Sequence, residues 1–277
     1  MVGRYVTAEP LSIRSKAKYG SDIIIMTKDG YVALSTIVQQ GRISDVAAFS
    51  RAINRAIKER TDRSYMSFGW EAILYAKESL FLFNVPISQF EYEQHVMNTV
   101  TKRWCRFTAI NVSCMGIFGD RLFGGMRDGT VVGLMEGTND LGEQINHIAL
   151  PAFNYFGESG YNKTITAAQI ISTHQKPSLI NLRGYSDFNY PNNMDELKTL
   201  PPSTLATWST NPTNPPTAGS YWNEDFWSIG ETQFSTRGWQ NVCGFGYAVS
   251  VMVRFATIDL GVRWRSTGIR FNMDGSQ

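Results

Sequence analysis

The sequence predicts a mainly β protein, in which partial β-propeller blades with one inserted α-helix precede a β-sandwich-like C-terminal domain. Three observations predict this fold class: a repeated Asp-Gly hairpin, closely spaced strands after residue 70, and alternating apolar residues near the C-terminus. The predicted boundaries are residues 1–144 for the blade region and 145–277 for the second domain.

A basic-Asp-Gly corner occurs twice between apolar runs, as Lys28-Asp29-Gly30 and as Arg127-Asp128-Gly129. Asp-Gly in this setting predicts a hairpin with a primed turn, whose central residues take positive φ. A repeated hairpin is typical of an architectural unit used more than once, such as a propeller blade.

Residues from about 8 to 41 are expected to form strands, and one helix is expected over about 44–61, capped by Ser44 or Asp45. Its apolar face consists of Phe49, Ala52, Ile53, Ala56 and Ile57. Its outer face carries Arg51, Arg55, Lys58 and Arg60, followed by Arg63. A solvated helix face is one interpretation of these charges. The other is a binding surface for a phosphate backbone or for an acidic neighbouring subunit.

Four short strands are expected between residues 70 and 107, which is the size of one blade. A further unit begins near 114 and continues through the second Asp-Gly hairpin. This gives about two blades plus a partial one, whereas a closed propeller needs at least four. We therefore expect another polypeptide to supply the remaining blades, or the β-domain to be a reduced version.

The last third of the chain has a different pattern. A strand is expected over 164–171, and a Pro-rich loop over about 190–219. Two strands with alternating apolar residues, 247–255 and 258–265, are expected to close the chain as one half-buried antiparallel sheet.

The charge, the hydropathy and the cysteine spacing of the chain exclude several classes of protein. The formal net charge is only +2, so the whole chain has no strong preference for nucleic acid or acidic membranes. No stretch approaches the apolar length of a membrane span, and the N-terminus lacks the apolar core of a signal peptide, so folding in a cytoplasm is expected. Cys105, Cys114 and Cys243 have no metal-type spacing, and for Cys105 and Cys114 a buried thiol in apolar surroundings is expected.

No catalytic site, metal site or cofactor is predicted. The three histidines lie far apart in sequence and begin no ligand motif, so a structural or surface role is expected for His95, His147 and His174. The carboxylates Glu224, Asp225 and Glu231 suit glycoside hydrolysis only if folding brings two of them to the required separation.

Two groups of side chains are candidates for binding. Aromatic residues gather after the Pro-rich loop: Tyr221, Trp222, Phe226, Trp227 and Trp239. Sheet packing, a subunit interface and a sugar-stacking platform are the alternatives for them. Arg254, Arg263 and Arg265 are expected on one sheet face, either simply exposed or lining a channel for DNA.

Several segments resemble one family. They are "LFLFNVP" at 80–86, "QHVMNTVTKRWCRFT" at 94–108, "DRLFGGMRDGTVVGLMEGTND" at 120–140, "AFNYFG" at 152–157, "GSYWNEDFW" at 219–227 and "VRWRSTGIRF" at 262–271. Together they resemble the propeller-containing tail proteins of short-tailed bacteriophages, variously called packaged-DNA stabilisation, tail hub or nozzle proteins. The similarity spans most of residues 20–272 and consists of many weak matches.

The resemblance implies a non-enzymatic virion protein that assembles in the host cytoplasm. It would form a ring, expected to be hexameric, below the portal and adaptor, where the genome is retained and later passes. Implied partners are other tail proteins (the adaptor, a fibre or a protein that supplies further blades) and, non-specifically, the genome. Arg51, Arg55, Lys58, Tyr221, Trp222 and Trp227 are the expected interface residues.

Two other functions stay open. One is a glycan-binding module of a tail fibre or adhesin, which would use Trp222, Trp227 and Trp239. The other is a virion glycan hydrolase.

The chain departs from the family in one respect. Family members carry further β-rich sequence before the position that corresponds to Ile23, so this chain starts in the middle of the family's sequence pattern.

Overall fold

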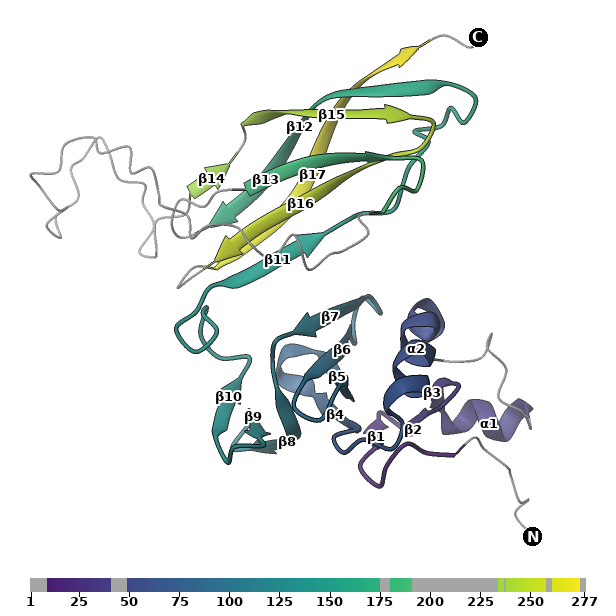
Figure 1. Ribbon diagram of the computed structural model, residues 1–277, viewed down its shortest axis with the longest axis vertical. Helices are drawn as coiled ribbons and strands as arrows, with labels where there is room; N and C mark the ends of the chain where they lie inside the picture. Colours follow the sequence, from purple (N-terminus) through teal and green to yellow (C-terminus); the bar gives the residue numbers. More distant parts are fainter. Residues whose placement is uncertain are drawn as a thin grey trace, which may run out of the picture. The chain divides into compact units, whose positions relative to one another are not determined.

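The computed structural model describes residues 9–40, 49–174, 180–190, 234–236, 238–257 and 261–274. The protein is mainly β, as predicted, with several antiparallel sheets. The chain divides into two units, residues 1–136 and 137–277 (Figure 1). No closed barrel or propeller is formed by the described residues.

Unit 1 begins with a three-stranded sheet and two helices. The sheet has the order β1 (Lys16–Tyr19), β2 (Asp22–Thr27), β3 (Gly30–Ala33). Helix α1 (Leu34–Gln40) follows β3 directly, so the prediction of strands up to residue 41 is wrong at its end. A 3₁₀ turn η1 (Arg51–Ile53) leads into helix α2 (Asn54–Ser64).

Helix α2 is the predicted helix, with different ends. It continues three residues beyond the expected end at Thr61, whereas Ser44 and Asp45 lie outside the described residues. Of the predicted apolar face, Phe49, Ile53 and Ile57 pack in or against the core, whereas Ala52 and Ala56 are exposed. Thr61 and Ser64 are buried with Ile57, so small polar side chains continue this face towards the end of the helix.

The next two sheets of unit 1 are antiparallel meanders. The first has the order β4 (Glu71–Tyr75), β5 (Leu80–Pro86), β6 (Tyr92–Asn98), β7 (Trp104–Thr108), with η2 (Ala76–Glu78) between β4 and β5. The second consists of β8 (Val112–Phe118), β9 (Arg121–Met126) and β10 (Val131–Leu134), with β9 in the centre. The four-stranded meander confirms the strands expected between residues 70 and 107.

The sheet β4–β7 is buried on both faces. From β5, Phe81 and Phe83 pack into a core shared with β2, β3 and α2, which includes Tyr31. The intervening Leu82 packs into a second core shared with β8, β9 and β10. The apolar run at 80–86 therefore lacks a polar face, because each side of the strand is covered by a different neighbouring sheet.

Both Asp-Gly corners form hairpins, but neither has the predicted primed turn. Gly30 and Gly129 take positive φ, +136° and +91°, while Asp29 and Asp128 do not. A primed turn of type I′ needs positive φ at both central residues. At the second corner the Gly129 N–H donates to the Met126 carbonyl at 3.2 Å, so the glycine closes an ordinary turn instead.

The two corners differ in their surroundings, which predicts unequal effects of Gly→Ala changes. A Cβ at Gly30 would lie 2.9 Å from Asn54 Oδ1 and 3.1 Å from Ser50 Oγ. A Cβ at Gly129 would have no such neighbour within 4 Å. We expect Gly30→Ala to lower the free energy of unfolding by about 2–3 kcal/mol and Gly129→Ala by about 1 kcal/mol. Urea denaturation of both variants measures this, and equal losses would contradict the buried position of the first corner.

Unit 2 consists of two sheets that pack face to face. One has the order β11 (Ile145–Ala149), β16 (Val249–Thr257), β13 (Ile180–Ser186). In the other, β12 (Asn162–His174) pairs with β17 (Val262–Asp274) and with β15 (Trp239–Gly246) and β14 (Phe234–Thr236). The core between them includes Ile165, Ile170, Leu182, Val242, Val251 and Val253.

The prediction that the last two strands form one sheet is wrong. β16 lies between β11 and β13, whereas β17 pairs with β12 along twelve residue pairs of their register. Alternation along a strand reveals which residues face a core, but it carries no information about which strand is the partner. The strand expected over 164–171 is confirmed as part of β12.

Candidate interaction surface

A buried carboxylate, Glu93, lies beneath α2 on strand β6. Only 2% of its side chain is exposed. Arg60, from the inner side of α2, donates from Nε to Glu93 Oε1 at 2.8 Å and from Nη2 to Oε2 at 3.1 Å. Arg106, on the neighbouring strand β7, lies 3.6 Å from Oε2. The two-pronged contact with Arg60 fixes both the position and the rotation of the helix on the sheet.

The Glu93 carboxyl is held in its ionised form. Burial by itself would raise its pKa, but the hydrogen bonds from His95 and Arg60, together with the charge of Arg60, outweigh burial. The pKa of Glu93 falls as a result from 4.5 to about 2.

His95 connects this carboxylate to the core beneath β3. Its Nε2 lies 3.3 Å from Glu93 Oε1, and its Nδ1 lies 2.9 Å from the hydroxyl of Tyr31. Burial, and then the charge of Glu93, raise the pKa of Tyr31 well above its ordinary value, so the hydroxyl keeps its proton and donates to Nδ1. A proton on Nε2 then donates to Glu93, which fixes the tautomer of the ring.

The order carboxylate–histidine–hydroxyl resembles a catalytic relay, but its position is that of a structural element. Tyr31 is fully buried and stacks on Phe83 with 4.2 Å between ring centroids, so no substrate can reach its hydroxyl. Within the described ranges, no group of three or more His, Cys, Asp or Glu side chains is placed to hold a metal ion. The network therefore anchors α2 to the sheet.

The low pKa of Glu93 predicts a pH dependence of stability. Because the folded-state pKa lies below the ordinary 4.5, the ionised carboxylate stabilises the fold above about pH 4.5, and this stabilisation is lost as pH falls towards 2. The gap corresponds to about 3 kcal/mol. Denaturation curves of the wild type and of Glu93→Gln should differ by this amount at pH 7, by about half of it at pH 3, and should converge only below about pH 2. A difference that does not change with pH would contradict this assignment.

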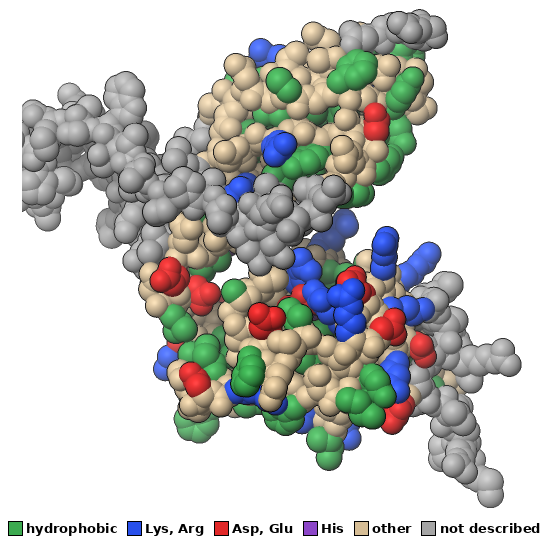
Figure 2. Space-filling model, viewed as in Figure 1, with side chains coloured by type: hydrophobic (Ala, Val, Ile, Leu, Met, Phe, Trp, Pro, Cys, Tyr) green, Lys and Arg blue, Asp and Glu red, His purple; other side chains and the backbone are tan. Residues whose placement is uncertain are grey.

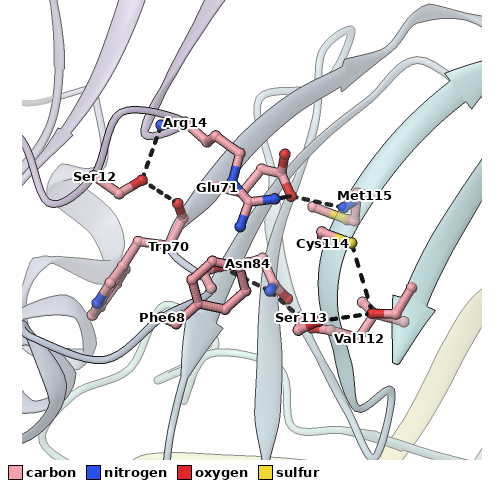
Figure 3. A network of polar contacts seen from close by, with 12 residues as sticks. Ser12, Arg14, Phe68, Trp70, Glu71, Asn84, Val112, Ser113, Cys114 and Met115 are labelled. Carbon is pink, nitrogen blue, oxygen red and sulfur yellow. Dashed lines mark hydrogen bonds and ion pairs between the residues drawn. The ribbon is translucent and has the colours of Figure 1, made fainter. Parts of the chain in front are cut away.

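A second polar network lies on the opposite face of the same sheet (Figure 3). Glu71 Oε2 accepts the Met115 N–H at 2.7 Å and lies 3.6 Å from Arg14. The Asn84 amide donates to the carbonyls of Gly69 and Val112, both at 2.9 Å. Burial raises the pKa of Glu71, while the Met115 N–H and the Arg14 charge oppose this rise. These contacts join the sheet β4–β7 to its neighbours by directed bonds as well as by apolar packing.

The outer side of α2 carries the predicted basic residues. Arg51, Arg55 and Lys58 are exposed at spacings of four and three residues, so they follow one stripe of the helix. Figure 2 shows Lys and Arg side chains gathered in the region of α2 and β7. We call the exposed residues Arg51, Arg55 and Lys58 the basic stripe. Arg60, expected with them, turns inward to Glu93 instead.

The sequence-based search missed Glu93, His95, Arg60 and Tyr31 as one network. One signal was available, because an acidic residue and a histidine alternate within the strand just before the apolar pair Val96 and Met97. Charged residues at core positions of a strand are rarely left unpaired. The partner in the helix, thirty-three residues away, had no local signal.

The other predicted interface residues cannot be placed. Tyr221, Trp222 and Trp227 lie outside the described residues, as does the predicted loop beyond Tyr190. Trp239 is 46% exposed on β15, and the guanidinium of Arg270 lies 4.7 Å from the centroid of its ring. One face of that ring is therefore occupied by a cation, which leaves at most the other for a sugar.

The structure separates the three arginines that were predicted to share a sheet face. Arg254 is on β16, whereas Arg263 and Arg265 are on β17 in the other sheet of unit 2. Arg263 and Arg265 are exposed, and Arg254 is partly buried. That prediction is wrong because β17 pairs with β12 and not with β16.

The remaining histidines and the cysteines occupy ordinary positions. His147 stacks on Phe255 with 4.6 Å between centroids, and burial lowers its pKa. The side chain of His174 lies outside the described residues. All three cysteines are free, and Cys105 is exposed on the edge strand β7, so the expectation that it is buried is wrong.

Comparison of the sequence with protein-family models and with curated proteins finds no match. No helix in the described ranges is long and apolar enough to cross a membrane.

Proposed function

We propose that this chain is a structural component of a short phage tail, a nozzle or hub protein. It would form a ring below the portal and adaptor that retains the packaged genome and gives it passage during ejection. One observation supports this proposal above the others: three consecutive antiparallel sheets, β1–β3, β4–β7 and β8–β10, pack in series, with the middle one buried on both faces. Propeller blades pack against their neighbours in the same serial way.

Two of the segments that carry the family resemblance lie where these sheets pack together. The motif at 80–86 is strand β5, whose two faces contribute to two different cores. The motif at 94–108 supplies His95 to the inner network and Gln94 to the outer one, where its amide donates to Asn84 at 2.8 Å. The resemblance therefore falls on residues that determine how successive sheets stack, which is what a blade architecture requires.

The sheets of unit 1 are, on this proposal, blades of a propeller completed by another chain, and the packed sheets of unit 2 are a β-sandwich. The basic stripe on α2 would contact an acidic neighbouring subunit, and Arg263 and Arg265 would contact the genome. Such contacts would be electrostatic and independent of DNA sequence. The protein would act through its interfaces, without a catalytic step.

Charge reversal of the basic stripe tests the interface. In the variant Arg51→Glu, Arg55→Glu, Lys58→Glu we expect assembly with tail partners to weaken at least tenfold, because three attractive contacts become repulsive. The measurement is the mass of the assemblies that form in native conditions. A matched control reverses three exposed cations elsewhere, Lys16→Glu, Lys18→Glu, Lys77→Glu. Equal assembly by both variants would remove the stripe from the interface.

A further inference from the structure

Two nitrogens of the Arg254 guanidinium are withdrawn from solvent. Val249, Val251 and Val253 of β16 point into the core of unit 2, so Arg254 belongs to the opposite face of the sheet. The two nitrogens are Nε and Nη2, and neither has a hydrogen-bond partner within the described part of the chain. Burial lowers the pKa of the group. Withdrawing a charge from water without pairing it destabilises a fold, so this arrangement is incomplete.

The two nitrogens lie on the same edge of the guanidinium group. Nε–H and Nη2–H are parallel donors on one edge of the planar guanidinium, the edge that binds two oxygens of one anion. A point charge such as lysine could not present this edge. The orphaned donors therefore specify the shape of the missing partner as well as its sign.

Two neighbours of Arg254 on the sheet face, Asn181 and Arg183, carry further donors. In register, Arg254 is paired with Asn181 of β13 and with Ile148 of β11. Arg183, paired with Met252, lies diagonally across from Arg254 on the same face and is exposed. Such diagonal positions are about 7–8 Å apart, within reach of two long side chains. Strands β11, β13 and β16 contain no Asp or Glu, so an anion must come from outside them.

We propose that Arg254, Arg183 and Asn181 form a binding site for a phosphate group. Two guanidinium groups and an amide offer more donors than one carboxylate can accept, whereas a phosphate has oxygens pointing in several directions. Arg254 is only partly buried as a whole residue, and binding would require its side chain to rotate until the donor edge reaches the phosphate. The site rests on the sheet of unit 2 alone and does not require the proposed role in a phage tail.

The test compares the full chain with Arg254→Met in chloride, phosphate and acetate buffers of equal ionic strength. In chloride we expect Arg254→Met to unfold at a higher temperature than the wild type, because the variant removes an unpaired buried charge. Phosphate should raise the wild-type midpoint by about 2–4 °C in a saturable way and leave Arg254→Met unchanged. Acetate should have no such effect.

Two further variants separate folding from binding. Arg254→Lys keeps the charge but loses the donor edge, and it should lose most of the phosphate response while remaining folded. Arg103→Met removes an exposed arginine of unit 1 and should keep the full response. A short DNA duplex that displaces inorganic phosphate would identify a phosphodiester as the natural ligand; binding of inorganic phosphate without displacement would identify a free phosphate group.

Three results would overturn the proposal. If acetate stabilises the wild type as much as phosphate does, the site binds carboxylates. If Arg254→Met is less stable in chloride and phosphate has no effect, Arg254 is already paired by another part of the chain. If Arg254→Lys responds to phosphate as the wild type does, the donor edge is not the binding element.

Discussion

Glu93→Gln is expected to lower the free energy of unfolding by about 3 kcal/mol at pH 7. The change keeps the shape of the side chain but removes its charge, which leaves Arg60 without its ion pair and His95 without its carboxylate acceptor. The Arg60 guanidinium then loses two charge-assisted hydrogen bonds to the sheet, which weakens the attachment of the helix. Chemical denaturation measures the loss, and a weakened α2 should also exchange its amide hydrogens faster.

A matched control for this variant is Glu78→Gln in η2, an exposed residue of the same unit. It should change the free energy of unfolding by less than about 0.5 kcal/mol. Comparable losses in both variants would show that Glu93 contributes only as a surface charge. A double-mutant cycle with Arg60→Met should give a coupling energy of at least about 1 kcal/mol between the two side chains.

Lys163→Met is expected to destabilise unit 2 by about 3–5 kcal/mol. Lys163 is completely buried at the start of β12, and its ammonium group donates to the backbone carbonyls of Glu158, Tyr161 and Tyr247. Methionine fills a similar volume but leaves three carbonyls without a donor. The ammonium thus closes the loop before β12 onto the turn between β15 and β16.

The exposed cation Arg265 on β17 provides the control for Lys163. Arg265→Met should leave the free energy of unfolding within about 0.5 kcal/mol of the wild type. Thermal unfolding of both variants, followed by tryptophan fluorescence, distinguishes them. If Lys163→Met were as stable as the control, water would have to satisfy the three carbonyls, and the ammonium would not be needed for closure.

Local features of the sequence were sufficient to predict much of unit 1. The apolar run at 80–86 and its neighbours predicted the four strands of the central meander, because short connections leave few alternative pairings. The Asp-Gly corners predicted two hairpins. Their turn type was predicted incorrectly, since only Gly30 and Gly129, and neither aspartate, take positive φ.

Features that depend on distant partners could not be predicted in the same way. β16 and β17 look alike in sequence, yet they belong to different sheets, because pairing is decided by which strand completes each core. Arg60 was indistinguishable from its neighbours on α2 until the position of Glu93 was known. Helix periodicity describes one face, but it does not identify a single charged residue that turns towards a buried partner.

The most direct test of the proposed role is the native mass of the full chain, measured alone and after mixing with other tail proteins of the same virion. The account predicts a closed ring, expected to be hexameric, that forms either from this chain alone or with a partner that supplies further β-sheets. A chain that stays monomeric in both conditions and binds oligosaccharide would contradict it and would favour a glycan-binding module instead.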